Sequence, residues 1–356
     1  ERISKEFIRP FDLNNPPLLR AALIRFGDEK HLLLFDMHHI ISDGVSTSIL
    51  TKDFTAFYRG DQLPELKIHY KDYASWHNSL LESDVIEETE DYWLNKLENF
   101  TYTELPISKK FNQEEIRAES YDILFDRELT ARIDDFCQQH QVTRFSFLLA
   151  IFKVILMKTI NQNDIALGIS TAGRGHQQVE EMLGVFLNIL ITRSKIDKDD
   201  KFVEYVDDLS QQLQEDQDNQ EYPYERLYAR MKDDYNYQKN SLFSILCNYL
   251  PYQEDEKLEL DNVVIKPYEF EEEVDPKFDL SIYINETEDE LFFRTVYKNL
   301  LDQGMVENMM DSFEVVINKV LQDDEIRVNE IRLEGADNIE TFTKDFEEEF
   351  EGLDLF

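Results

Sequence analysis

The sequence predicts a mixed α/β or α+β fold organised in two lobes. Short apolar runs that suit strands alternate with longer segments of helical periodicity, which is typical of such folds. The length of 356 residues exceeds that of one typical domain. Apolar residues make up 42% of the chain, enough for a sizeable core despite 31% charged residues.

The N-terminal elements surround a polar loop, His38–Gly44. Two apolar runs joined by a Gly-Asp-Glu-Lys turn precede this loop and predict a hairpin of two largely buried strands. A segment with apolar residues at helical spacing follows it and stops at Arg59-Gly60. The expected elements are strands over 18–26 and 31–38, a helix over 45–58, a linker around Pro64 and one helix over 74–97.

A second region opens at Leu105-Pro106 and continues the alternation. Its expected elements are helices over 127–139, 144–159, 201–218 and 303–321, strands over 164–170, 184–196 and 328–333, and a hairpin over 280–285 and 291–297. The expected domains are an N-terminal lobe over 1–78, a C-terminal lobe over 79–334 and an acidic, Phe-rich tail over 335–356. We expect this tail to pack onto the second lobe or to dock in trans.

Charge and composition exclude several classes of function. The net charge of −38 repels nucleic acid and anionic lipid, and no glycine-rich phosphate loop occurs. The longest apolar stretch, 145–157, is interrupted by Lys153 and is shorter than the ~20 residues that a bilayer requires, so it predicts a buried helix. Cys137 and Cys247 are the only cysteines, as expected in a reducing compartment. We therefore expect a cytoplasmic protein that binds neither nucleic acid nor membrane.

The loop His38–Gly44 has three interpretations. A metal site would use His39 and Asp43, but zinc needs at least three converging ligands, and adjacent histidines point apart in a continuing strand. A structural loop would bury one histidine and use Asp43 as a helix N-cap. A catalytic loop would place an imidazole beside the backbone N–H groups near Gly44, where an oxyanion could develop, while Asp43 holds the loop through a buried ion pair. We expect no metal.

The same seven residues, HHIISDG, resemble the HHxxxDG motif of condensation domains from nonribosomal peptide synthetases. These domains belong to the chloramphenicol acetyltransferase-like superfamily. Further partial matches follow in the family's order along almost the whole chain. They are residues 10–20 before the motif, YKDYASW at 70–76, AGR at 172–174 with GVFLN at 184–188, NQEYPYE at 219–225, and SLF to NY at 241–249.

The resemblance implies two acyltransferase-like lobes in a V arrangement with a central tunnel. Upstream donor and downstream acceptor peptidyl carrier proteins would present their substrates on 4′-phosphopantetheine, and this chain would bind no cofactor of its own. The implied reaction is amide formation between a donor acyl or peptidyl thioester and the amine of an acceptor aminoacyl thioester. Other synthetase domains would be further partners.

By the same resemblance, His39 is the catalytic histidine and Gly44 contributes backbone contacts. His38 and Asp43 are then mainly structural. The candidates for the tunnel floor and wall are Gly184, Asn188 and Asn248.

The chain departs from the family pattern at its start. The opening motifs, including an arginine-bearing segment expected to pair with Asp43, do not occur, so we expect an N-terminally incomplete first lobe. Arg174 is open to two interpretations, a surface cation or an ion-pair partner. Three other functions stay open: a catalytically silent carrier-docking platform, which usually lacks the second histidine of the motif, an epimerisation domain, which shares the motif, and an acyltransferase that uses coenzyme A thioesters. The stretch 172–188 favours condensation over epimerisation.

Overall fold

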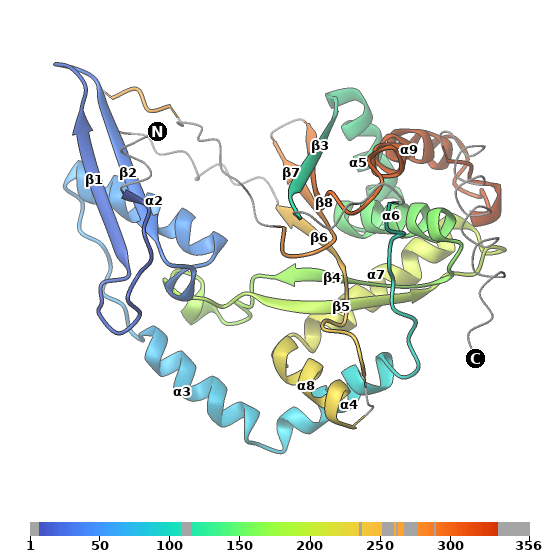
Figure 1. Cartoon of the computed structure of the whole chain (residues 1–356), viewed down its shortest axis with the longest axis horizontal. Helices are drawn as coiled ribbons and strands as arrows, with labels where there is room; N and C mark the ends of the chain where they lie inside the picture. Colours follow the sequence, from blue (N-terminus) through green and yellow to red (C-terminus); the bar gives the residue numbers. More distant parts are fainter. Residues whose placement is uncertain are drawn as a thin grey trace. The chain divides into compact units, whose positions relative to one another are not determined.

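The computed structural model of the chain describes residues 7–108, 116–234, 237–250, 260, 263–266, 276–287 and 290–333. The chain divides into two compact units, whose elements Figure 1 labels. Unit 1 consists of residues 1–82, 172–187 and 253–268, and unit 2 of residues 83–171, 188–252 and 269–356. The tail 335–356 lies outside the described residues. The V arrangement and the tunnel stay predictions of the resemblance.

Unit 1 contains a hairpin followed by two helices. Strand β1 (Leu19–Arg25) pairs antiparallel with β2 (His31–Met37), as the two apolar runs predicted. Helix α2 (Gly44–Arg59) ends at Gly60, whose φ of 85° is the left-handed conformation that favours glycine at a helix end. Helix α3 spans Tyr70–Leu81. The predicted hairpin and first helix are therefore confirmed.

Two expectations about unit 1 and its boundary are wrong. The hairpin is not buried on both faces, because the paired residues Leu23 and Leu33 are 69% and 46% exposed, whereas Leu34 on the other face is 6% exposed. The helix expected over 74–97 is two helices, α3 and α4 (Val85–Lys96). Ser83 and Asp84 lie at the break, and both residue types favour turns and helix starts because their side chains compete for backbone groups.

Unit 2 contains, among its described residues, one six-stranded mixed sheet in the order β3-β8-β7-β6-β4-β5. The central strands β4, β6 and β7 are parallel, and the other pairs are antiparallel. The bounds are β3 Ala118–Phe125, β4 Asp164–Thr171, β5 Asn188–Lys195, β6 Ile245–Leu250, β7 Leu280–Glu286 and β8 Leu291–Lys298. The strands β3 and β6 were not predicted, and β5 begins four residues after the start expected at 184.

The helices of unit 2 enclose a long apolar helix, α6, in which residues 147–152 and 154–156 are inaccessible to solvent. Phe313 of α9 contacts Phe152 of α6 and Phe293 of β8, with ring centroids 5.8 and 5.2 Å apart, so α6, α9 and the sheet share one core. The bounds are α5 Arg127–His140, α6 Arg144–Ile160, α7 Phe202–Asp218, α8 Tyr224–Asp234 and α9 Gln303–Gln322. The expected strand at 328–333 is wrong, because Val328–Glu330 forms a short 3₁₀ helix.

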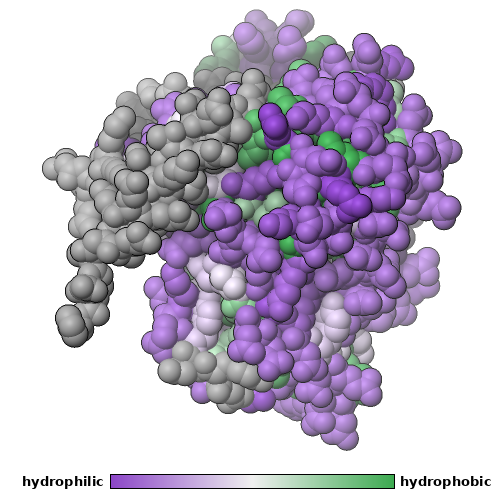
Figure 2. Space-filling model, turned by 90° about the vertical axis from the view of Figure 1, so that its right-hand side faces the viewer, coloured by the Kyte–Doolittle hydropathy of each residue, from purple (hydrophilic) through white to green (hydrophobic). Residues whose placement is uncertain are grey.

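Lys153 lies within this apolar helix and is itself inaccessible to solvent. Its amine donates hydrogen bonds to the hydroxyls of Thr192 and Ser194 on β5, at 2.9 and 2.8 Å. Burial lowers the pKa of this amine well below its ordinary value of 10.5. No helix within the described residues is long and apolar enough to cross a membrane. The face in Figure 2 is covered mainly by hydrophilic residues, in keeping with the charge of −38.

We predict that Gly168→Ala destabilises unit 2 by about 1–3 kcal/mol, the usual cost of overpacking a core. A Cβ atom at position 168 would lie 2.6 Å from the buried Phe243 ring, which has little room to move. Chemical denaturation measures the loss. Gly27→Ala is the control, because a Cβ atom there meets nothing within 4 Å. Equal stabilities of the two variants would contradict the prediction.

Candidate functional site

The histidine loop lies between β2 and α2 and begins with a 3₁₀ turn, His39–Ile41. His38 caps this turn, because its Nδ1 accepts a hydrogen bond of 3.0 Å from the Ile40 N–H. The His38 ring also packs edge-on against Phe11, with centroids 6.0 Å apart. His39 is exposed. The two adjacent histidines therefore differ in their surroundings, since His38 is engaged within the fold and His39 is open to solvent.

Asp43 ends the loop and is the N-cap of α2. Its Oδ1 accepts hydrogen bonds from the Ser46 N–H at 2.8 Å, the Ser46 hydroxyl at 2.7 Å and the Arg174 guanidinium at 3.0 Å. Its Oδ2 accepts from the Phe186 N–H at 3.1 Å and from Arg174 at 3.2 Å. The Ser46 hydroxyl also contacts the backbone of Gly184, so one carboxylate joins the start of α2 to residues 174–186.

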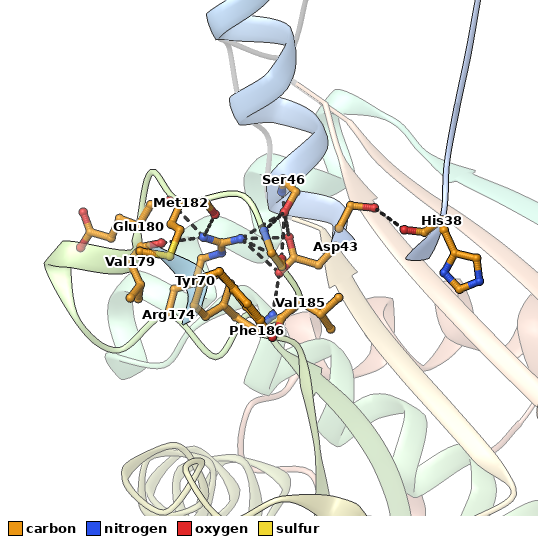
Figure 3. Close-up of polar contacts among 12 residues, drawn as sticks. His38, Asp43, Ser46, Tyr70, Arg174, Val179, Glu180, Met182, Val185 and Phe186 are labelled. Atoms are coloured by element: carbon orange, nitrogen blue, oxygen red, sulfur yellow. Dashed lines mark hydrogen bonds and ion pairs between the residues drawn. The ribbon is translucent and has the colours of Figure 1, made fainter. Parts of the chain in front are cut away.

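Arg174 is the buried partner of Asp43, with side chains 6% and 2% exposed. Figure 3 shows its guanidinium between Asp43 and a turn of the same unit. Its Nη1 donates to the carbonyls of Val179, Glu180 and Met182, at 2.6, 3.4 and 2.7 Å. Its Cζ lies 4.2 Å from the centroid of the Phe186 ring. The structure therefore selects the ion-pair interpretation of Arg174. The arginine partner of Asp43 is Arg174 and does not come from the opening segment in which the resemblance had placed it.

Glycine is required at two positions around this pair. Gly173 has a φ of 62°, and a Cβ atom there would lie 1.8 Å from the Phe186 carbonyl oxygen. A Cβ atom at Gly184 would lie 2.1 Å from the Tyr70 ring. The Tyr70 hydroxyl donates a 2.7 Å hydrogen bond to the Val185 carbonyl. Close backbone approach therefore packs the 173–186 segment against α3 and Asp43.

The environment of Asp43 favours its charged form. Burial acts to raise the pKa of this carboxyl group, but the Ser46 hydroxyl, the backbone N–H groups of Ser46 and Phe186 and the charge of Arg174 together lower it below the ordinary value of 3.8. The Asp43 carboxylate accepts five hydrogen bonds, from α2 and from residues 174–186.

The remaining predicted residues lie at different places. Gly44 is exposed in the first turn of α2, next to Asp43 and the loop of His39. Gly184 lies beside Ser46 in unit 1. Asn188 belongs to unit 2, and its amide group donates to the carbonyls of residues 220 and 222 while its oxygen accepts from the N–H groups of residues 189 and 224. Asn248 is half-buried on β6 in unit 2.

The structure brings His38, His39, Asp43, Gly44 and Gly184 together in unit 1. Ser46 was not predicted as a site residue, and Tyr70 was recognised only as part of the YKDYASW match at 70–76. Ser46 had a local signal, because it lies three positions after the Asp43 N-cap, where its hydroxyl reaches the cap's carboxylate. No group of three or more His, Cys, Asp or Glu side chains that could hold a metal ion occurs in the described part of the chain.

The comparison with known families identifies the class of this fold and site. A family model for the condensation domain matches residues 1–340, so the chain belongs to the condensation-domain family. It is 34% identical over 333 residues to tyrocidine synthase 2 of Brevibacillus parabrevis, a match that covers 92% of this chain. The same match covers 9% of that relative, so the chain spans less than a tenth of its length.

Solved structures share the fold at low sequence identity. The X-domain from teicoplanin biosynthesis is similar with a TM-score of 0.78 and 18% identity, over 93% of this chain and 78% of that one. The epimerization domain from the third module of tyrocidine synthetase B is similar with a TM-score of 0.70 and 18% identity, over 87% and 73%. These likenesses confirm the predicted mixed α/β fold of condensation domains.

We predict that Arg174→Met destabilises unit 1 by about 3–5 kcal/mol, because removing one partner of a buried ion pair leaves an uncompensated charge. Hydrogen exchange of peptides from residues 38–60 measures the effect. Arg25→Met is the matched control, since Arg25 pairs with Asp28 at an exposed site where such pairs contribute at most about 1 kcal/mol. If Arg174→Met lowers the stability of unit 1 by less than about 1 kcal/mol, Asp43 does not carry a buried charge that depends on Arg174.

The lowered pKa of Asp43 also predicts a pH dependence. In the unfolded chain this group titrates near 3.8, and in the folded chain at a lower pH. Its contribution to stability is therefore fully present above pH 3.8 and is lost as the pH falls through the folded pKa. Denaturation of the wild type and of Asp43→Asn at a series of acidic pH values measures it. The difference in unfolding free energy between the two proteins should become smaller as the pH falls. A difference that becomes larger would contradict a lowered pKa of Asp43.

Proposed function

We propose that the chain forms an amide bond in nonribosomal peptide synthesis, between a donor acyl or peptidyl thioester and the amine of an acceptor aminoacyl thioester. The observation that carries this proposal is the division of roles in the HHxxxDG loop of a condensation-family chain. His39 is exposed and available to a substrate, while Asp43 is buried and occupied by five hydrogen bonds.

The proposed reaction is attack of the acceptor amine on the donor thioester carbonyl. The N–C bond forms, the C–S bond breaks, and the amine proton leaves with the carrier's thiol. An α-amine has a pKa near ~8, so a fair fraction is already neutral at neutral pH. His39 orients the amine by accepting its hydrogen bond, takes up the amine proton as the intermediate forms and returns it to the departing thiolate. N–H groups in the first turn of α2, around Gly44, lie next to the loop and suit the developing oxyanion.

The partners follow from this chemistry as part of the proposal. A donor and an acceptor peptidyl carrier protein present the two thioesters on 4′-phosphopantetheine, and this chain supplies side chains and backbone groups without a cofactor of its own. The match to a much longer synthase supports the proposal that this chain works together with carrier proteins. A reducing, cytoplasmic location is supported by Cys137 and Cys247, which are both free and buried.

A second candidate function is epimerisation, because the epimerization domain of tyrocidine synthetase B shares the fold. That activity would exchange the α-proton of one tethered residue instead of joining two. A third candidate is a catalytically silent platform for carrier proteins. An assay with two loaded carrier proteins separates the three, since it gives a longer peptide on the acceptor carrier, an inverted stereocentre on one carrier, or no change.

We predict that His39→Ala lowers amide formation at least tenfold, because general base catalysis contributes about 10²–10⁴-fold and part of the amine is already neutral. Mass spectrometry of the acceptor carrier measures the product. His31→Ala removes another exposed histidine of the same unit and should retain wild-type turnover. Wild-type turnover of a folded His39→Ala protein would refute the assignment of His39.

A further inference from the structure

We propose that Ser46 is a positioning residue for this reaction, acting through Asp43 and Gly184 to fix the orientation of the loop that carries His39. The inference rests on the proposed function and extends it to a side chain outside the HHxxxDG motif. Ser46 is inaccessible to solvent, so it acts on other protein groups and not on a substrate.

The Ser46 hydroxyl is a junction between two segments that are distant in sequence. Its oxygen lies 2.7 Å from Asp43 Oδ1 and 2.9 Å from the Gly184 carbonyl oxygen, and it accepts from the Gly184 N–H at 3.1 Å. Arg174 Nη2 approaches the same oxygen at 3.4 Å. Figure 3 shows the dashed contacts among Ser46, Asp43 and Arg174 at this junction.

The number of protons limits how these contacts are used. A hydroxyl has one proton to donate and two lone pairs that accept. Ser46 therefore donates its proton to Asp43 Oδ1, the shorter contact at 2.7 Å, while its lone pairs serve the Gly184 N–H and Arg174. The Gly184 N–H thus donates to a hydroxyl of α2, and the Gly184 carbonyl oxygen lies 2.9 Å from that hydroxyl and 3.5 Å from Arg174 Nη2.

The position of His39 depends on this junction because His39 and Asp43 lie close together in the same loop. Only three residues separate His39 from Asp43, and the Asp43 carboxylate is fixed by donors from α2 and from residues 174–186. Without the Ser46 hydroxyl, Asp43 Oδ1 loses one of its three donors and the buried N–H of Gly184 loses its acceptor. The Ser46 hydroxyl is also the strongest of the contacts that lower the pKa of Asp43, so its removal raises that pKa.

The hydroxyl can be separated from the helix cap. In Ser46→Ala the backbone N–H of residue 46 still donates to Asp43, so the N-cap of α2 is retained and only the junction is lost. Ser46→Cys fills nearly the same space with a weak donor, which controls for the loss of packing volume. Thr47→Ala is the matched control, because Thr47 is the next residue of the same helix and is exposed.

The test combines kinetics with hydrogen exchange on the full chain. With two loaded carrier proteins, we expect Ser46→Ala and Ser46→Cys to lower kcat at least tenfold and to leave KM for the acceptor carrier within twofold, while Thr47→Ala matches the wild type. In hydrogen exchange, peptides covering 38–46 and 184–187 should exchange at least tenfold faster in the two Ser46 variants, with peptides of unit 2 unchanged.

The outcomes distinguish failure of this inference from failure of the proposed function. A wild type that forms no amide with any carrier pair refutes the proposed function, and local exchange still decides whether Ser46 holds the loop. Wild-type kcat or wild-type exchange of residues 38–46 in Ser46→Ala overturns the positioning role. Faster exchange throughout both units also overturns it, because that result indicates general destabilisation.

Discussion

The negative charge of a buried carboxylate must be balanced by hydrogen bonds and a countercharge, because it has lost its contact with water. In unit 1 the Asp43 carboxylate sets this requirement for the segments that surround it. Its five hydrogen bonds come from α2 and from residues 174–186. The conformation of the histidine loop, the start of α2 and the return of residues 172–187 to unit 1 therefore depend on one another. The exposed His39 stands on a loop whose downstream end is fixed by this polar network.

The two units reach stability by different means. Unit 2 has a continuous apolar core in which the buried helix α6 packs with α9 and the sheet. The buried apolar residues of unit 1 are few in the described part of the chain, and one cluster of them, Val179, Met182 and Phe186, lies beside Arg174. Unit 1 therefore relies more heavily on directional hydrogen bonds, which fix a unique geometry and tolerate little substitution.

The elements that could be predicted from sequence are those with strong local signals. Continuous apolar runs predicted α6, β4 and the hairpin of β7 and β8, and Gly60 predicted the end of α2. β6 was missed because Asn248 and Tyr249 interrupt its apolar pattern. The partner of Asp43 could not be assigned locally, because Arg174 lies 131 residues away and only the fold brings the two together. Burial of the hairpin was overestimated because apolar character alone does not reveal which face has a partner.

The discontinuous path of unit 1 has a consequence for biosynthesis. As the ribosome releases the chain from its N-terminus, Asp43 emerges long before Arg174, and β4 of unit 2 is completed between them. Until residue 187 has been synthesised, Asp43 lacks two of its partners, the Arg174 guanidinium and the Phe186 N–H. Closure of unit 1 thus involves contacts that are distant in sequence, and it requires residues that are synthesised after β3 and β4 of the sheet in unit 2.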